Sequence, residues 1–140
     1  QAEYQARNSG LSAGVSAYNS YRAQLNSANY LGGYEAERSH LYANYADVDF
    51  QSGGIENPDN IDELNAFLRE LYEERYVFFI GHLEAFNDFG RTNNIAEIEL
   101  KSGNTGTPQR FIYPQSEINS NPNVPSPLPS VTEKTPVNNL

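Results

Sequence analysis

The strongest constraint on the fold is the hydrophobic pattern of residues 60–91, NIDELNAFLRELYEERYVFFIGHLEAFNDFGR. In its first half, apolar side chains recur at steps of three and four, which places them on one stripe of an α-helix. The stripe consists of Ile61, Leu64, Phe67, Leu68, Leu71 and Tyr72. Most charged side chains fall off it. The sequence therefore predicts a long amphipathic helix that packs on one face.

The sequence indicates where this helix begins and where its pattern stops. We expect Asn60 to be the N-cap and Glu63 to complete a capping box at the third helical position. Residues 76–80, Tyr-Val-Phe-Phe-Ile, are apolar all round, so we expect other parts of the protein to cover them on every side. Gly81 then interrupts the pattern.

Residues 74–94, ERYVFFIGHLEAFNDFGRTNN, resemble the signature of one branch of the SusD/RagB family. That signature is a helix ending in Glu-Lys-Tyr, a hydrophobic run with glycine, and then Glu-Ala-Trp-Asn-Asp-Trp-Arg-Arg-Thr-Gly. The matching residues here are Glu74, Tyr76, Gly81, Glu84, Ala85, Asn87, Asp88, Arg91 and Thr92. Phe86 and Phe89 stand in place of the two tryptophans, and Gly90 replaces the first arginine of the pair.

A second match follows in residues 108–123. It is similar to the family's Pro-x-Arg, Tyr-Pro-x-x-Glu and closing Asn-Pro-Asn motifs, which fall here at 108–110, 113–117 and 121–123. Both matches have the order and spacing of the family.

The resemblance implies a surface lipoprotein of the outer membrane in Bacteroidetes. Such proteins resemble one another in being mostly helical with tetratricopeptide-like helix pairs. They bind glycans or other nutrients, cover a SusC-like TonB-dependent transporter, and are not enzymes. Full members are several times longer, so the resemblance implies that this chain corresponds to their carboxyl-terminal part. The upstream part of the same protein is then an expected partner and carries the lipid anchor.

The amino-terminal residues predict an αα-hairpin. A helix over residues 1–8 is expected to stop near Ser9 and Gly10, and a second helix is expected over residues 12–26, with the stem of Arg22 along its apolar stripe. The resemblance implies that this hairpin is the family's last tetratricopeptide-like pair. Because solenoid repeats need neighbours, and the chain contains no Met, we expect a fragment whose neighbouring repeat lies upstream of Gln1.

Tyrosines are frequent between the two helical regions. Tyr30, Tyr34, Tyr42 and Tyr45 are the candidate ligand-binding residues, because a tyrosine ring stacks on the apolar face of a sugar while its hydroxyl bonds to the rim. The alternative is that these rings fill space between helices. Residues 35–45 also allow a short helix.

Residues 47–58 resemble a calcium-binding loop in one respect, because Asp47 and Asp49 alternate in the manner of an EF-hand. The pattern fails, since Ser52 stands where glycine is required and Pro58 where a bidentate glutamate belongs. A looser site with Glu56, or a solvated acidic loop, remains open. We predict no metal and no cofactor.

No catalytic constellation is evident. Glu73 and Glu74 are adjacent and point about 100° apart on a helix, so they cannot flank a glycosidic bond. Glu70 shares a face with Glu74, and we expect both to be solvated beside Arg69 or Arg75. The sequence has two histidines, His40 and His82, but no cysteine and no nucleophile-elbow motif with which they could form a catalytic site. We expect His82 to bond a backbone group.

The charge balance excludes one class of partner. The net charge is −9 and the sequence has no basic stripe to displace counterions from phosphates, so we reject a nucleic-acid partner. No apolar run approaches the length that spans a bilayer.

The carboxyl-terminal half is expected to be irregular. Phe86 and Phe89 should fold back on residues 76–80, and Asp88 should pair with Arg91. A short turn is expected at residues 116–118. Residues 119–140 hold five of the eight prolines, so they should either lie extended over the surface or remain disordered. In the extended case, the expected anchors are Val124, Leu128 and Val131.

The sequence therefore predicts an all-α protein with a tetratricopeptide-like helix pair, a long later helix and a loop-rich, extended carboxyl-terminal segment. The resemblance implies that residues 1–118 are the helical carboxyl-terminal part of a SusD-like domain, and we expect residues 119–140 to be a Pro/Asn-rich extended tail. The expected function is binding of a glycan or similar oligomer and its delivery to a transporter at the cell surface. The alternative is a tetratricopeptide-like protein-interaction module, and a weaker one is a fragment of a polysaccharide-degrading enzyme.

Overall fold

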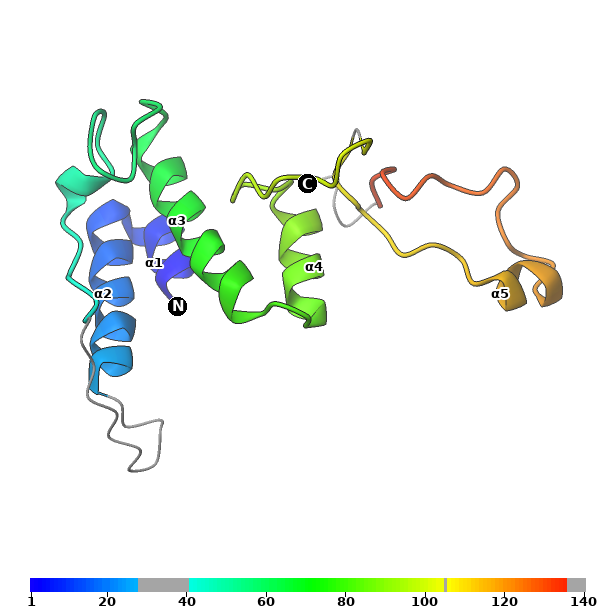
Figure 1. The fold of residues 1–140 in the computed structure, drawn as a ribbon, viewed down its shortest axis with the longest axis horizontal. Helices are drawn as coiled ribbons and strands as arrows, with labels where there is room; N and C mark the ends of the chain where they lie inside the picture. The colour runs from blue at the N-terminus through cyan, green and yellow to red at the C-terminus, as the bar shows by residue number, and fades with distance from the viewer. Residues whose placement is uncertain (28–40, 105, 136–140) are drawn as a thin grey trace. The chain divides into compact units, whose positions relative to one another are not determined.

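The computed structural model describes residues 1–27, 41–104 and 106–135, and their regular structure is helical throughout (Figure 1). The elements are α1 (Ala2–Ser9), α2 (Leu11–Ser27), the 3₁₀ turn η2 (Asp47–Asp49), α3 (Glu63–Phe78), α4 (Leu83–Arg91) and α5 (Gln115–Ser120). The all-α prediction is confirmed. The chain divides into two compact units, Gln1–Leu71 and Tyr72–Leu140, and the division falls within α3.

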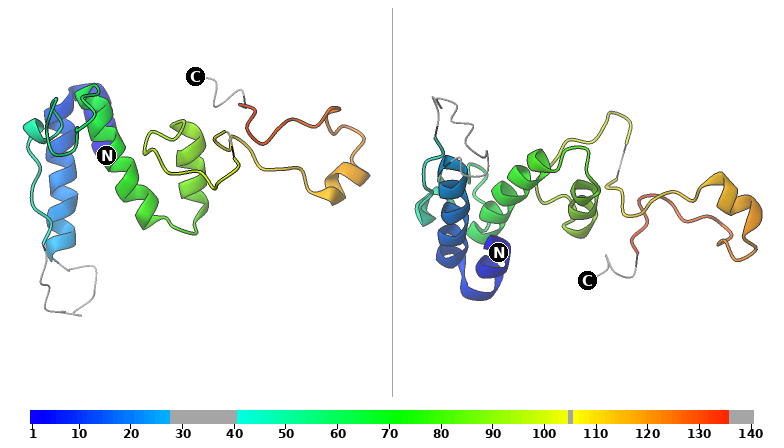
Figure 2. Two further views of the ribbon diagram at one scale, coloured as in Figure 1. Left: turned by 45° about the horizontal axis from the view of Figure 1, so that its top comes forward. Right: turned by 90° about the horizontal axis from the view of Figure 1, so that it is seen from below.

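The first unit begins with the predicted αα-hairpin. Helices α1 and α2 lie side by side in all three ribbon views (Figures 1 and 2). Gly10 makes the turn between them with a φ of 92°, a left-handed conformation that glycine adopts without strain, and its N–H donates to the Ala6 carbonyl at 3.2 Å.

Aromatic residues from three segments form the core of the first unit. Phe67 on α3 and Phe50 after η2 are fully buried and meet edge to face with ring centres 5.2 Å apart. Tyr18 of α2 contacts the Phe67 ring edge to face at 6.0 Å. Of the apolar stripe predicted for α3, Phe67, Leu68, Leu71 and Tyr72 are buried, whereas Ile61 lies before the helix and is 36% exposed.

The start of α3 differs from the prediction. Asn60 is not the N-cap, because it lies before the helix in a left-handed conformation with a φ of 57°. Instead the Asp62 carboxylate accepts a hydrogen bond from the Asn65 N–H at 3.1 Å, and Asp62 takes the capping role. Asn57 fixes the approach to the helix: its buried amide pairs with both the N–H and the carbonyl of Ile61.

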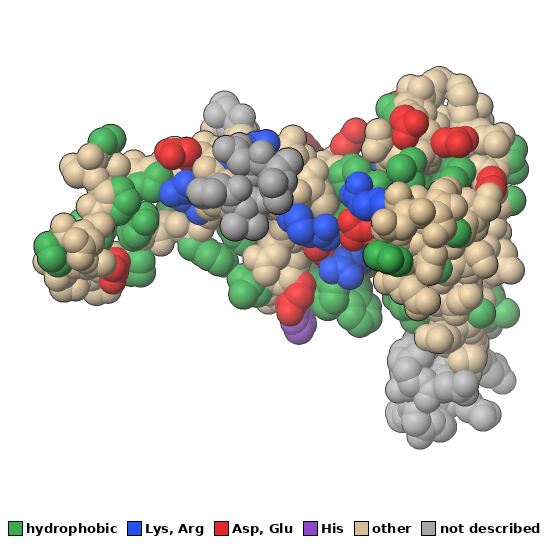
Figure 3. Space-filling view, turned by 180° about the vertical axis from the view of Figure 1, so that it is seen from behind, with side chains coloured by type: hydrophobic (Ala, Val, Ile, Leu, Met, Phe, Trp, Pro, Cys, Tyr) green, Lys and Arg blue, Asp and Glu red, His purple; other side chains and the backbone are tan. Residues whose placement is uncertain are grey.

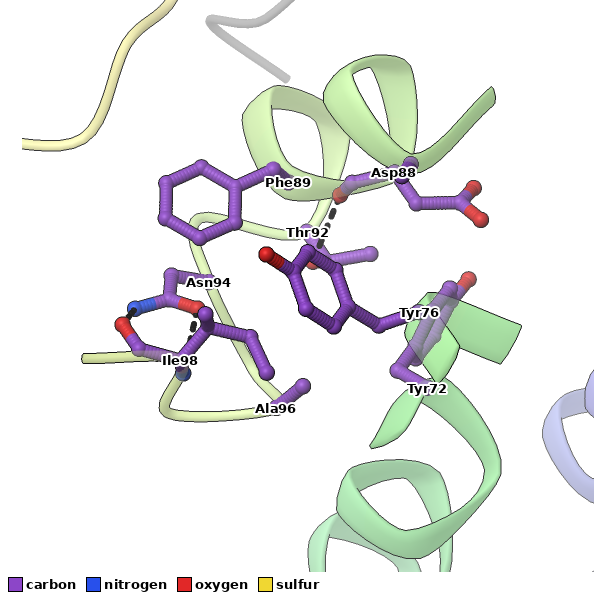
Figure 4. A pocket seen from close by; sticks show the side chains of 9 residues that line it. Tyr72, Tyr76, Asp88, Phe89, Thr92, Asn94, Ala96 and Ile98 are labelled. Atoms are coloured by element: carbon purple, nitrogen blue, oxygen red, sulfur yellow. Dashed lines mark hydrogen bonds between the residues drawn. The ribbon is translucent and has the colours of Figure 1, made fainter. Parts of the chain in front are cut away.

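The second unit has a small aromatic core, shown in Figure 4. Phe89 of α4 lines a cavity of about 10 Å³ with Tyr72 and Tyr76, which is room for one water at most. Phe89 therefore lies near the region expected. Phe86 stacks on Phe111 with ring centres 4.4 Å apart, a contact that the sequence did not predict.

Residues 76–80 are more exposed than predicted. Val77, Phe78 and Ile80 are 67%, 67% and 64% exposed, and Leu83 of α4 is exposed beside them in sequence. Hydrophobic side chains are visible at the surface in the space-filling view (Figure 3). The expectation of cover on every side is wrong for the described residues of this chain, which supply too few apolar partners to enclose this stretch.

The carboxyl-terminal segment is held mainly through its backbone. The Gln109 N–H donates to the Val131 carbonyl at 2.8 Å, and the Arg110 guanidinium donates to the carbonyls of Glu133 and Lys134 at 3.0 and 3.2 Å. The predicted turn near residue 116 is the short helix α5. Leu128 and Val131 are exposed and Val124 is half-buried, so the two former residues are not the apolar anchors that we expected.

The contact between α1 and α2 predicts the effect of Gly14→Ala. A Cβ at residue 14 would lie 2.5 Å from the Ala6 Cβ and 2.9 Å from the Phe67 ring. Alanine ordinarily stabilises a helix interior by about 0.5–1 kcal/mol over glycine, but overpacking costs about 1–3 kcal/mol. We expect a net loss of stability in urea denaturation. Ser16→Ala on the exposed face of α2 is the control, and a Gly14→Ala chain at least as stable as wild type would contradict this packing.

Candidate functional site

The candidate site lies in the first unit, where residues 41–46 run extended along α2 (Figure 1). Two asparagines of α2 hold this segment by its backbone. The Asn19 amide accepts from the Tyr45 N–H at 2.9 Å and donates to the Tyr45 carbonyl at 2.8 Å. Asn26 makes the same pair of bonds with Tyr42, both at 2.8 Å. Each amide thus satisfies a donor and an acceptor that the extended chain would otherwise leave to water.

Arg22 lies between these asparagines in sequence and meets three tyrosine rings. Its guanidinium carbon is 4.1 Å from the ring centre of Tyr45, 5.1 Å from that of Tyr42 and 5.5 Å from that of Tyr18. Tyr18 and Tyr45 also stack at 6.0 Å. Such cation–π contacts strengthen when water is excluded, and the Arg22 side chain is only 11% exposed.

Two carboxylates converge on the Tyr45 hydroxyl. The hydroxyl is 2.6 Å from Glu56 and 3.1 Å from Glu70, and the Tyr18 hydroxyl also donates to Glu70, at 3.2 Å. The Glu70 carboxylate lies 3.8 Å from the Arg22 guanidinium and is 17% exposed. The expectation that Glu70 is a solvated charge is therefore wrong, because α3 turns it toward the tyrosines of the other segments.

This environment changes the titration of Tyr45. Burial of its ring is the largest cause, and the neighbouring Glu56 and Glu70 carboxylates add to it by disfavouring a second negative charge. Together they raise the pKa of Tyr45 well above the ordinary value of about 10. The hydroxyl therefore remains a hydrogen-bond donor at physiological pH.

A shallow groove of about 490 Å³ opens beside the segment that Asn19 and Asn26 hold. One wall is α2, which contributes the hydroxyls of Ser12, Ser16 and Ser20, and the other is the segment with Asn44 and Asp47. The groove has the volume of a small-ligand site and a mostly neutral polar lining. Such a surface can offer hydrogen bonds to an uncharged polar ligand.

The structure places two of the four candidate tyrosines. Tyr42 is 45% exposed and Tyr45 lines the groove, but the hydroxyl of Tyr45 is already bonded within the protein. Tyr30 and Tyr34 lie outside the described residues, as does His40. Residues 41–45 of the possible short helix are extended, and the rest of that stretch is likewise outside the described residues.

Sequence reasoning missed Asn19 and Asn26. Their spacing of seven residues, two helical turns, places both on one face of α2, and this was the signal that could have found them. What it could not supply was the partner, because the bonds join residues 16 and 26 positions apart in the sequence.

The acidic residues of the rejected calcium loop have partners within the protein. Asp49 accepts from the Ala46 N–H at 2.8 Å, Asp47 accepts from the Ser12 hydroxyl, and Glu56 accepts from Tyr45. Across the described part of the chain, no three side chains of His, Asp or Glu are grouped to hold a metal ion.

In the second unit, Asp88 and Arg91 of the first motif form a cluster of polar contacts with Arg75 and Tyr72 of α3, which we call the structural joint. Asp88 of α4 pairs with Arg75 at 2.7 Å and with Arg91 at 3.1 Å, and Arg91 also donates to the Tyr72 hydroxyl. The predicted pair of Asp88 and Arg91 is confirmed. His82 precedes α4 and makes no capping bond with its side chain, while its ring meets Phe79 edge to face at 6.2 Å.

Comparison with protein-family models, with curated proteins and with solved structures finds no match to this chain. Among the residues that the structure describes, none of the helices is both long and apolar enough to cross a bilayer.

The hydroxyl network predicts the effect of Tyr45→Phe. The change removes the bonds to Glu56 and Glu70, and we expect a loss of about 1–2 kcal/mol in the free energy of unfolding at neutral pH. Urea denaturation measures it. Tyr4→Phe, at an exposed position of α1, is the control and should be neutral.

The same variant tests the pH dependence. Because the folded-state pKa of Tyr45 is raised, its contribution is fully present below the unfolded value of about 10 and is lost as pH rises further. Wild type should therefore lose more stability than Tyr45→Phe between pH 9 and about pH 11. Parallel stability profiles for the two proteins would contradict the raised pKa.

The joint in the second unit predicts the effect of Asp88→Asn. The change removes the negative charge facing Arg75 and Arg91, and because both arginines are substantially exposed, we expect a loss of only about 0.5–1 kcal/mol. Thermal unfolding in low and high salt measures it, and the difference from wild type should shrink in high salt. Glu99→Gln, at an exposed position outside the helices of the same unit, is the control and should change nothing.

Proposed function

We propose that this chain is the carboxyl-terminal part of a SusD-like nutrient-binding lipoprotein of the outer-membrane surface. In this role it helps to hold a glycan or similar oligomer and to pass it to a SusC-like TonB-dependent transporter. No bond is made or broken in the process. The upstream part of the same protein carries the lipid anchor.

The observation that carries this proposal is the pair of motifs in residues 74–94 and 108–123, in the family's order and spacing. The first motif contributes to the joint around Asp88, and its Phe86 stacks on Phe111, which lies in the second. The helix pair of α1 and α2 supports the proposal further, because the family contains such pairs.

The groove beside α2 suits a binding role. Its hydroxyl and amide lining suits an uncharged polyol. Tyr42 does not line the groove, but it is 45% exposed on the same segment and offers an aromatic face on which a sugar can stack. Arg22 and Asn26 fix the position of Tyr42 through its ring and its backbone.

The carboxylates of this region favour binding over hydrolysis. A glycosidase needs two carboxylates that flank the scissile bond about 5–10 Å apart and leave room for it. Here Glu56 and Glu70 both contact the hydroxyl of Tyr45, so an internal side chain occupies the space between them.

The first experiment establishes the parent protein. We expect the natural protein to be several times larger than this chain, to carry an amino-terminal lipid, and to co-purify with a TonB-dependent transporter. Intact mass and amino-terminal sequencing measure the first two. A mature protein that begins at Gln1 without a lipid would overturn the proposal and favour the tetratricopeptide-like interaction module.

The second experiment tests the ligand class. Titration of soluble polysaccharides into the parent protein should give binding without release of reducing ends. Tyr42→Ala should weaken it about tenfold through loss of a stacking contact, whereas Tyr4→Ala on α1 should leave it unchanged. Binding unaffected by Tyr42→Ala would remove this residue from the site, and a rise in reducing ends would contradict the non-catalytic role.

A further inference from the structure

Asn19 and Asn26, which we call the asparagine clamp, are spaced so that they can hold the backbone of any extended chain. Asn19 and Asn26 are seven residues apart on α2, a rise of about 10.5 Å. The peptide groups that they hold, at Tyr42 and Tyr45, are three residues apart, which spans about 9–10 Å in an extended chain. Two helical turns therefore match three extended residues, and the match depends on backbone geometry alone.

The contacts made by the clamp are those between neighbouring strands. Each asparagine amide offers one acceptor to an N–H and one donor to the carbonyl of the same residue, as a strand does in a ladder. Ser12, seven residues before Asn19, donates to the side-chain carboxylate of Asp47; this contact lies outside the backbone register, because only two residues separate Tyr45 from Asp47. The bound segment runs antiparallel to α2, because residues 12, 19 and 26 contact residues 47, 45 and 42 in turn.

Selectivity comes from the slot that takes Tyr45. Its ring lies against the Arg22 guanidinium and the Tyr18 ring, and it meets Phe50 edge to face at 5.1 Å. Its hydroxyl reaches Glu56. This face of α2 therefore binds the backbone of the segment at two residues and recognises the side chain of one tyrosine.

We propose that the face of α2 that carries Asn19, Arg22 and Asn26 is a receptor for an extended, tyrosine-bearing strand. Residues 41–47 of a second copy of the chain can occupy this receptor in place of the chain's own residues 41–47. The second copy is the occupant that the contacts favour, because its segment supplies the matching tyrosine, the two gripped peptide groups and the Asp47 partner of Ser12. Exchange of this kind goes beyond the proposed function, although the exchanged segment also forms one wall of the groove.

The chain's own segment competes with any second strand. A tethered segment acts at an effective concentration on the order of millimolar, so wild type should be mostly self-occupied in dilute solution. Weakening the resident segment without altering α2 should free the receptor. Tyr45→Ala does this, since it removes the side chain that the slot reads.

The test uses the full chain and a fluorescent synthetic peptide of residues 41–50. We expect the peptide to bind Tyr45→Ala at least tenfold more tightly than wild type, measured by fluorescence anisotropy. Adding Asn19→Ala and Asn26→Ala to that variant should weaken binding at least tenfold. A peptide with alanine at its own position 45 should not bind. Circular dichroism checks that each protein is folded.

Three outcomes would overturn the proposal. These are a folded Tyr45→Ala chain that does not bind the peptide at millimolar concentration, binding that persists without the two asparagines, and equal binding of the alanine peptide. If Tyr45→Ala does not fold, Tyr45→Phe replaces it, because this variant keeps the ring and loses only the bonds of the hydroxyl, which weakens the resident segment. Peptide binding to Tyr45→Phe no tighter than to wild type would equally reject the receptor.

Mixing two full-length variants distinguishes a second copy from other partners. Tyr45→Ala keeps the receptor, and the Asn19→Ala, Asn26→Ala chain keeps the strand. We expect each to sediment as a monomer at a concentration where the mixture forms a one-to-one complex. Peptide binding without such a complex would reject the second copy as the occupant and leave free extended peptides in its place.

Discussion

Backbone groups outside helices need hydrogen-bond partners, and in this chain asparagine side chains supply many of them. Asn19 and Asn26 pair with Tyr45 and Tyr42, Asn57 pairs with Ile61, and Asn94 pairs with Ile98 at 2.9 and 3.0 Å. Each amide replaces the two bonds that a neighbouring strand would give. Irregular segments are therefore fixed in place, although the described residues contain no sheet.

The clamp also determines what the aromatic residues of the first unit can do. With Tyr45 held by its backbone, its ring enters the space among Arg22, Tyr18 and Phe50, and its hydroxyl meets Glu56. The same interaction thus links the core to the groove and to the proposed strand receptor. Tyr42 is held in the same way but keeps an exposed ring, so one tyrosine serves the interior and the other faces solvent.

The second unit has a different balance of forces. Its ion pairs around Asp88 and its stack of Phe86 on Phe111 are well formed, yet Val77, Phe78 and Ile80 remain exposed. Burial of apolar side chains is what normally stabilises a helix end of this composition, at about 25 cal/mol for each Å² removed from water. The structural joint formed by the motif is therefore local, and it leaves an apolar surface beside it.

Local patterns in the sequence determined the helices, because spacing at three and four residues, turn glycines and prolines act within a few positions. The αα-hairpin at Gly10, the stripe of α3 through Phe67 and the pairing of Asp88 with Arg91 all followed from such patterns. The cap at Asp62, the hydrogen bonds of Glu70 to Tyr18 and Tyr45, and the clamps of Asn19 and Asn26 did not. The two clamps and the bonds of Glu70 join residues far apart in the chain, and the cap depended on the backbone turn at Asn60. Only the tertiary structure decides such contacts, because hydrogen bonding and burial depend on which segments meet.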